Sequence, residues 1–487
     1  MQRGLEANMA ATTAQTSLKN QLFVGSFIHS KKLNQLEYLH GAAVCVDKSG
    51  TIVAVDTQCA GDVKRAAATL YPTLGEGWSE EEVVVQVAKE GQFFFPGFID
   101  THIHASQYPN AGIFGSSTLL DWLNTYTFPL EASLADPSKA RKVYSRVVRK
   151  TLSHGTTCAA YYATIDVAST NLLADLCLAA GQRALVGRVC MDSPLSPEYY
   201  RDESPAQSIA ATRATIAHIA RIDPAMALVR PVITPRFAPS CSIPLMQALG
   251  ALAAETDLPI QTHLSENKNE IALVRELFPT ADTGAADDSY TAVYDAFGLL
   301  SRRTIFAHAV HLSEAEADLI ALRGAKVSHC PCSNSAITSG AARVRWLLDK
   351  GVCCGLGTDV SGGYSPSVLE AARLAALVSR HVAMGGDEAA KLTVEEVLYL
   401  ATRGGAEVVG LEDKVGGFEV GLEWDAQLIG LGSVGEDGDV EDGEEDGNVD
   451  FFGWETWEER VAKWVYNGDD RNTRKVWVRG RLVHERK

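Results

Sequence analysis

Two histidines one residue apart, His102 and His104, are the first residues in the chain whose types and spacing could do chemistry. They follow a Pro-Gly pair and end a short apolar run, which is the pattern of a buried strand. Because side chains alternate along a strand, both imidazoles point to one side, where they can share one divalent metal ion. The alternative is two ordinary polar residues at a strand end, and the pair alone does not decide between them.

Three later apolar runs end in residues of the same kind, namely His263 with Glu266, then His308, then Asp359. Histidine and carboxylate ligands suit zinc or a similar divalent ion, and a glutamate beside a metal-activated water can accept and return its proton. Taken singly, the histidines could be hydrogen-bonded core residues, Asp359 a helix N-cap and Glu266 a capping residue. Their shared place at four strand ends favours one metal site.

The elements that would position these residues form a regular alternation. Short apolar or β-branched runs alternate with helical stretches from residue 93 to about residue 412, and eight such units predict an α/β protein with a (β/α)8 TIM barrel. A doubly wound open sheet would show the same alternation. The expected strands are 93–104, 155–163, 183–192, 228–236, 258–266, 304–311, 325–334 and 352–360, and helices are expected at 140–152, 208–221, 243–254, 314–323, 365–380 and 393–404.

Strand patterns recur on both sides of this barrel segment, 93–412. We expect 20–92 and 413–487 to pair into a small β-sandwich domain. Residues 1–19 are expected to be a disordered tail and 433–450, rich in Gly, Glu and Asp, a disordered surface loop. The domain should contain a hairpin at 41–55, strands at 82–87, 418–420 and 426–429, and a final hairpin around Gly480.

Composition excludes several classes of partner. The chain is 46% hydrophobic and carries a formal charge of −17, of which nine carboxylates lie in 436–450, so nucleic acid and anionic membranes are not expected partners. Ten cysteines do not make a dense disulfide framework. The sequence has no signal-like start and no apolar run near the roughly 20 residues of a membrane span, which predicts a reduced, cytoplasmic protein.

Several motifs together resemble the amidohydrolase superfamily, and most closely those members that deaminate guanine. The resemblance extends from about residue 23 to 483 and is far more specific than His-x-His alone. The motifs are Pro-Gly-Phe-Ile-Asp-Thr-His-Ile-His-Ala-Ser-Gln-Tyr at 96–108, Thr-Pro-Arg-Phe at 234–237, His-Leu-Ser-Glu-Asn at 263–267, His-Cys-Pro at 329–331, Gly-Leu-Gly-Thr-Asp-Val-Ser-Gly-Gly-Tyr at 355–364 and Gly-Asp-Asp-Arg-Asn at 468–472.

The resemblance implies a hydrolase of purine catabolism that converts guanine and water to xanthine and ammonia. Glu266 would move a proton to the purine ring, Asp359 would help to deprotonate the attacking water, and His308 would orient that water. One zinc ion per subunit would be held by four ligands. These are His102, His104, His263 and Asp359.

The resemblance also implies how the substrate is recognised. Arg236 would donate to the 6-oxo edge, where the amino group of adenine would be a mismatch, Gln107 would donate or accept, and Phe237 would lie beside the ring. His263, Glu266 and Asp359 would also contact the substrate, and family members are commonly homodimers. His329 and Asn334 would either shape the pocket or be satisfied core residues. Cys332 stands where the family often has a polar residue such as asparagine.

Two alternatives remain open. One is another amidohydrolase deaminase or chlorohydrolase that acts on a related nitrogen heterocycle, and the other is a non-catalytic barrel scaffold. The separate zinc deaminase pattern, His-x-Glu with Pro-Cys-x-x-Cys, is absent, because Cys332 is followed by Ser333, Asn334 and Ser335.

Overall fold

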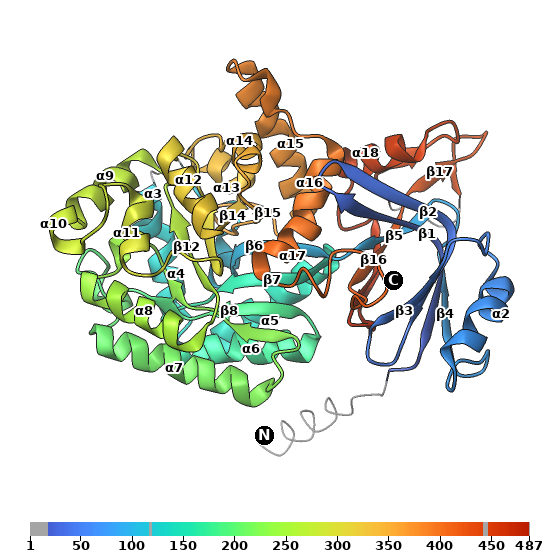
Figure 1. The fold of residues 1–487 in the computed structure, drawn as a ribbon, viewed down its shortest axis with the longest axis horizontal. Helices are drawn as coiled ribbons and strands as arrows, with labels where there is room; N and C mark the ends of the chain where they lie inside the picture. Colours follow the sequence, from blue (N-terminus) through green and yellow to red (C-terminus); the bar gives the residue numbers. More distant parts are fainter. Residues whose placement is uncertain (1–17, 116–118, 442–446, 487) are drawn as a thin grey trace.

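The computed structural model describes residues 18–115, 119–441 and 447–486. In Figure 1 the chain forms two neighbouring parts, a ring of strands wrapped by helices on the left and a β-sheet built from both ends of the chain on the right. The blue N-terminal strands and the orange to red C-terminal segments lie side by side in that sheet.

The terminal sheet has eight strands in the order β21-β20-β16-β5-β1-β2-β3, with β4 paired to β1. The expected hairpins at 41–55 and around Gly480 are confirmed by the antiparallel pairs β2–β3 and β20–β21. The strands are β1 (Gln21–Lys32), β2 (Gln35–Val46), β3 (Ile52–Asp56), β4 (Val84–Val87), β5 (Gln92–Pro96), β16 (Ala426–Gly430), β20 (Thr473–Val478) and β21 (Arg481–Glu485).

Aromatic side chains hold the two ends of the chain together. Phe23 stacks on Trp424 with ring centroids 4.1 Å apart and meets Trp477 edge-on at 5.4 Å. Phe94 meets Phe23 edge-on at 5.5 Å. Fully burying such a side chain contributes about 1.5–3 kcal/mol, so this cluster explains why segments separated by the whole barrel share one sheet.

The ring contains eight strand positions, all parallel. One set runs β10-β8-β7-β6 and another β12-β13-β14-β15, and β9 and β11 extend the third and fourth positions. The strands are β6 (Phe98–His104), β7 (Thr156–Tyr162), β8 (Arg183–Gly187), β9 (Val189–Cys190), β10 (Val229–Pro231), β11 (Thr234–Pro235), β12 (Ile260–Leu264), β13 (Thr304–His308), β14 (Lys326–His329) and β15 (Cys354–Leu356).

Backbone hydrogen bonds join the two sets at both junctions. Between the fourth and fifth positions, the Gln261 amide donates to the Ile233 carbonyl at 2.9 Å. Between the eighth and first, the Asp359 amide donates to the His102 carbonyl at 2.9 Å and the His104 amide to the Val360 carbonyl at 3.1 Å. The eight positions therefore follow one another around a ring, as in the predicted barrel and not as in the doubly wound open sheet that the same alternation allowed.

Helices cover the outside of this ring, and the expected spans are close to the observed ones except at 393–404, where the chain forms two helices, α16 (Val394–Ala401) and α17 (Arg403–Val409), separated at Thr402. Asp136, Asp166, Ser204, Ser242, Ser313 and Ser367 each cap a helix by accepting from a backbone amide of its first turn. The main helices are α5 (Pro137–Ser153), α6 (Val167–Ala180), α7 (Pro205–Ile222), α8 (Ile243–Thr256), α9 (Lys268–Leu277), α12 (Glu314–Arg323), α15 (Val368–Met384) and α16 (Val394–Ala401).

The strand expected over 93–104 is wrong in one respect, because it is two strands. β5 pairs with β16 in the terminal sheet, and β6 starts the ring at Phe98. The chain passes between them at Gly97, where a Cβ atom would lie 2.2 Å from the Thr157 side chain. Residues 93–96 thus belong to the terminal sheet although the apolar run is continuous.

Two further expectations at the C-terminal end need correction. Residues 418–420 form no strand, because Phe418 packs into the aromatic cluster instead. The segment 433–450, expected to be a disordered loop, carries the short strands β17 (Gly432–Val434), β18 (Val440–Glu441) and β19 (Asp450–Phe451). Residues 442–446 of that loop and residues 1–17 of the expected tail lie outside the described residues.

The two parts of the molecule are also linked by charge. Arg183 at the start of β8 donates from Nε to Asp425 Oδ2 at 2.7 Å and from Nη2 to Asp425 Oδ1 at 3.0 Å.

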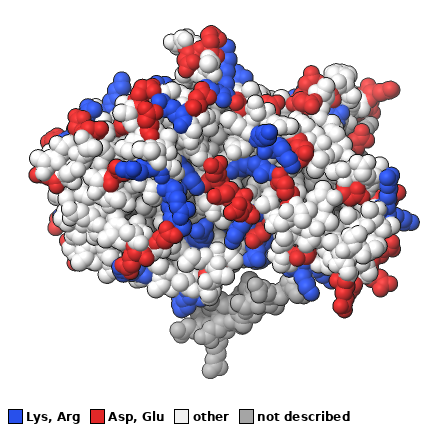
Figure 2. Space-filling model, in the orientation of Figure 1, with Lys and Arg blue, Asp and Glu red and all other residues white. Residues whose placement is uncertain are grey.

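On the face shown in Figure 2, basic and acidic side chains are interspersed. Among the described residues, every helix is too short or too polar to cross a membrane, and all ten cysteines are unpaired, nine of them buried.

Candidate active site

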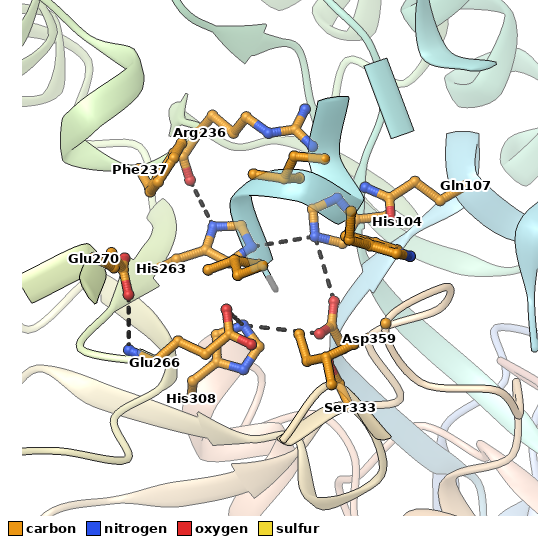
Figure 3. Close-up of a pocket in the computed structure, with 15 residues that line it drawn as sticks. His104, Gln107, Arg236, Phe237, His263, Glu266, Glu270, His308, Ser333 and Asp359 are labelled. Carbon is orange, nitrogen blue, oxygen red and sulfur yellow. Dashed lines mark hydrogen bonds and ion pairs between the residues drawn. The ribbon is translucent and has the colours of Figure 1, made fainter. Parts of the chain in front are cut away.

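A cavity lies at the C-terminal ends of the ring strands, where the sequence predicts the site (Figure 3). Its empty volume is about 440 Å³, which includes the space open to solvent at its mouth. Leu119, Trp122 and Leu123 form an apolar part of its wall. The predicted residues that line it are His104, Gln107, Arg236, Phe237, His263, Glu266, His308 and Asp359.

The predicted metal ligands lie in two overlapping groups, because the ligand atoms of His102, His104 and His263 lie within 4.8 Å of one another, and so do those of His102, His308 and Asp359. His102 Nε2 lies 3.1 Å and His104 Nε2 3.4 Å from Asp359 Oδ1, and His104 Nε2 lies 3.2 Å from His263 Nε2. Two donors that hold one zinc ion at about 2.0–2.1 Å with tetrahedral angles are about 3.3 Å apart. The observed separations therefore fit a shared ion.

The hydrogen bonds of the outer ring nitrogens support the same conclusion. His263 Nδ1 lies 2.6 Å from the Arg236 carbonyl oxygen, which can only accept, so His263 Nε2 presents its lone pair to the centre. His102 Nε2 is buried, and its contact with Asp359 lacks hydrogen-bond geometry. This nitrogen has no hydrogen-bond partner among the described residues and lies beside the ligand atoms of other histidines. Both features fit a metal ligand.

The charges at this point favour the ligand forms of the residues. Burial lowers the pKa of His102 and lowers the pKa values of His104 and His263 well below the usual range, so these imidazoles are neutral. The pKa of Asp359 is lowered although burial acts to raise it, so its carboxylate is ionised. Neutral imidazoles and an ionised carboxylate are the states that bind a cation.

Glu266 and His308 form a second layer of the site. Ser339 Oγ donates to Glu266 Oε1 at 2.8 Å, and Glu266 Oε2 lies 3.5 Å from His308 Nε2. Burial raises the pKa of Glu266, as expected for a group that must take up and release a proton. On the far side of the His308 ring, Nδ1 lies 2.9 Å from Asn334 Oδ1, which fixes the orientation of the imidazole.

The backbone is strained where the strands end at the cavity. Ser265, His308, Ala309 and Asp359 have φ values of 49°, 74°, 49° and 47°, in the left-handed region that non-glycine residues rarely adopt. Such strain of about 1–3 kcal/mol per residue persists where surrounding contacts impose it, and it is concentrated at functional sites. Here it turns His308 and Asp359 into the cavity.

In Figure 3, two of the predicted recognition residues, Arg236 and Phe237, lie above His263, and Gln107 lies beside His104. Arg236 is buried, and its Nη1 lies 2.6 Å from Glu131 Oε2 in α4 (Phe128–Ser133). Gln107, in the 3-10 turn η1 (Ala105–Asn110), donates from Nε2 to Glu131 Oε1 at 2.9 Å. Phe237 follows Arg236 and lines the wall.

Asn334 and His329, for which the sequence allowed either a pocket or a core role, lie in different places. Asn334 contacts His308 as described, whereas His329 lines a separate small cavity beside Ser379 and is not among the residues that line the main one. Cys332 is buried in α13 (Pro331–Ala336), next to Ser333, which does line the main cavity.

Three residues beside the site were not predicted from the sequence. Glu270 lines the cavity and accepts from the Glu266 and Asn267 amides at 3.0 and 3.2 Å. The Asn-x-x-Glu capping box of 267–270 is a sequence signal that could have placed Glu270. Ser339 and Glu131 carry no comparable signal.

A parallel ring whose strand ends bring four histidines, an aspartate and a glutamate together at one site defines a metal-dependent hydrolase of the barrel type. The family model described as Amidohydrolase family matches residues 93–483. The chain belongs to the amidohydrolase family.

The chain is similar to several known proteins over most of its length. It is 47% identical to a "Probable guanine deaminase" of Schizosaccharomyces pombe, covering 95% of this chain and 83% of that one. It is 41% identical to the guanine deaminase of Dictyostelium discoideum, covering 95% and 98%. A crystal structure of guanine deaminase from C. acetobutylicum with bound guanine matches with a TM-score of 0.81 and 32% identity, covering 96% and 100%.

Proposed function

We propose that this protein is a guanine deaminase, which hydrolyses guanine to xanthine and ammonia. The observation that carries the proposal is the grouping of His102 with residues that line one cavity. These residues are His104, His263, Asp359 and Glu266, and Arg236 and Gln107 line the same cavity. The relatives named above support the same activity.

We propose zinc as the metal, one ion per subunit, held by His102, His104, His263 and Asp359. Nitrogen and carboxylate donors at these separations suit zinc better than magnesium or calcium, which prefer all-oxygen sites. When bound, the ion would bring the pKa of a water molecule from 15.7 to near 7 and so supply a nucleophile at neutral pH.

Glu266 is the proposed proton carrier. Ser339 holds one carboxylate oxygen, so the other faces His308 and the cavity. As water oxygen forms its bond to C2 of guanine, Glu266 takes the water proton and delivers it to the purine ring. The C2–N bond then breaks, the second water proton leaves with the amino group as ammonia, and xanthine remains. Asp359 and His308 orient the water and assist its deprotonation.

Arg236 and Gln107 are the proposed recognition residues for the 6-oxo edge, with Phe237 beside the ring. Arginine can donate but not accept, so an amino group at position six would leave its donors unmatched. Discrimination of this kind can be large, because the site's buried polar groups lose their partners with the wrong substrate.

Three broader features are part of the same proposal. The reaction would serve purine catabolism, the protein would be a cytoplasmic enzyme, and it would form a homodimer. The ten unpaired cysteines agree with a reducing compartment. Sedimentation of the purified protein tests the dimer, and elemental analysis tests the metal and its stoichiometry.

Ammonia release from guanine, measured with and without a chelator and after adding zinc back, tests the activity. We expect turnover that the chelator removes and zinc restores. A panel with adenine and chlorinated triazines separates this function from the other heterocycle hydrolases of the family. Metal-loaded protein that releases no ammonia from guanine would contradict the proposal.

A further inference from the structure

Glu131 is a buried carboxylate that has no part in the proposed metal binding, proton transfer or substrate contacts. Glu131 is 1% exposed, and it is not one of the described residues that line the cavity. It lies behind the wall that Gln107 and Arg236 form. A buried carboxylate is costly unless it is fully paired, so its partners indicate what it does.

The partners of Glu131 include the two proposed recognition residues. Oε2 accepts from Arg236 Nη1 at 2.6 Å, and Oε1 accepts from Gln107 Nε2 at 2.9 Å and from Ser106 Oγ at 3.2 Å. The Arg236 guanidinium also lies over the Phe128 ring, one helical turn before Glu131, with 5.0 Å between its central carbon and the ring centroid. One short helix, α4, therefore holds both recognition side chains from behind.

An ionised carboxylate can accept hydrogen bonds but cannot donate them. The amide of Gln107 must therefore turn its NH2 group toward Glu131. Its Oε1 is the acceptor end and takes only long hydrogen bonds from the Ser361 amide at 3.4 Å and the Ser361 hydroxyl at 3.5 Å, so it can still accept from a ligand. Arg236 is anchored through Nη1 at 2.6 Å and, less closely, through Nη2 at 3.5 Å, and a guanidinium has five N–H groups, so others remain as donors. Together the two side chains present an acceptor and donors to the cavity.

That arrangement matches the lactam edge of a 6-oxo purine, which has a ring N–H beside a carbonyl. An amidine edge, with a bare ring nitrogen beside an amino group, has the opposite polarity. We infer that Glu131 is a positioning residue that fixes the hydrogen-bonding polarity of Gln107 and Arg236, and thereby the preference for a 6-oxo purine. The inference rests on the proposed function, because it takes that purine as the ligand.

Two ligands that differ only at the 6-oxo edge test this role by binding alone. Hypoxanthine carries the lactam edge, purine lacks it, and neither has a 2-amino group to release. We expect wild-type, metal-loaded protein to bind hypoxanthine the more tightly. Glu131→Gln should reduce that preference by about 10- to 100-fold, since its amide lets Gln107 turn over and removes the charge that anchors Arg236. Purine affinity should stay within about threefold.

Controls separate positioning from general damage. Glu396→Gln removes a buried glutamate that is paired with Arg345 away from the site, and it should leave the preference unchanged. In a Gln107→Ala background, Glu131→Gln should change the preference for hypoxanthine over purine by less, because the Gln107 side chain that Glu131 orients is absent. If Glu131→Gln does not fold, Glu131→Asp takes its place, because it keeps the charge on a shorter side chain. The ratio of hypoxanthine affinity to purine affinity is then measured for that variant.

Equal loss of affinity for both ligands, or an unchanged ratio, would overturn the inference while wild-type guanine turnover kept the proposed function intact. Wild-type protein that binds hypoxanthine no better than purine would also overturn it. Absence of guanine turnover in the wild type would contradict the proposed function, and this inference with it.

Discussion

The Nδ1 atom of His263 lies 2.6 Å from the carbonyl oxygen of Arg236. One hydrogen bond thus joins a candidate metal ligand to a candidate recognition residue across neighbouring strands of the ring. The Arg236 backbone sets the orientation of the His263 ring, while its side chain reaches Glu131. Arg236 therefore links the position of the metal to the position of the 6-oxo edge. Substitutions of metal-binding residues and of recognition residues can be compared for this reason.

Glu266→Gln should abolish most turnover and keep the metal. The amide fills the same space and can still accept from Ser339, but it cannot carry a proton at neutral pH. Since general acid–base catalysis contributes about 10²–10⁴-fold, we expect kcat for guanine to fall by about 1,000-fold. Ammonia release and elemental analysis measure the two effects. Glu276→Gln, at an exposed position of α9, is the matched control, and near-normal turnover by Glu266→Gln would remove the proton-carrier role.

Asn334→Ala should lower kcat by about 10- to 100-fold without loss of metal, because outer hydrogen-bond partners of this kind typically have effects of that size. The substitution removes the acceptor that faces His308 Nδ1 and frees the ring to change orientation or tautomer. Single-turnover kinetics with guanine measure the loss. Ser335→Ala, whose hydroxyl only donates to the Pro331 carbonyl within the same helix, should have little effect. Equal activity in both variants would place Asn334 outside the mechanism.

The strand ends and the residues they carry could be predicted from the sequence, because His102, His263 and Asp359 each follow an apolar run that is long enough to be a buried strand. The division of 93–104 into two strands could not. Phe93–Phe95 and Phe98–Ile99 are equally apolar, and only the contact between Gly97 and Thr157 shows where the chain leaves one sheet for the other.

Glu131 could not be predicted for a related reason. Its partner Arg236 is 105 residues away, and α4 is too short to show a periodic pattern that would mark one face as buried. A glutamate in such a segment is typical of a solvated helix face. Only the tertiary fold, which brings η1, α4 and the end of β11 together, indicates that it is enclosed.

Arg236→Ala should affect both stability and recognition, because it leaves the Glu131 carboxylate buried without its cation. Breaking a buried ion pair in this way costs about 3–5 kcal/mol. The double variant Arg236→Ala with Glu131→Gln should recover much of that stability and none of the guanine turnover. Thermal unfolding and ammonia release measure the two effects separately. A double variant that is no more stable than Arg236→Ala would contradict the charge-pairing argument.

His154, the residue that follows α5, should make the protein less stable below neutral pH. Burial, with the nearby Lys150 charge, lowers the pKa of His154 from 6.5 to about 4, although Asp469 and Asp470 act in the opposite direction and His484 in the same one. Because the unfolded chain takes up the proton first as the pH falls, stability that is present above pH 6.5 is lost between pH 6.5 and 4. For these pKa values the loss from pH 7 to pH 5 is about 2 kcal/mol.

His154→Gln should therefore be less sensitive to acid than the wild type, with a smaller decrease in unfolding free energy between pH 7 and pH 5. Denaturant titrations at several pH values, followed by tryptophan fluorescence, measure this difference. His381→Gln, at an exposed position of α15, is the control and should follow the wild-type pH dependence. Parallel curves for the wild type and His154→Gln would show that the His154 imidazole takes up its proton equally well in the folded and unfolded chains.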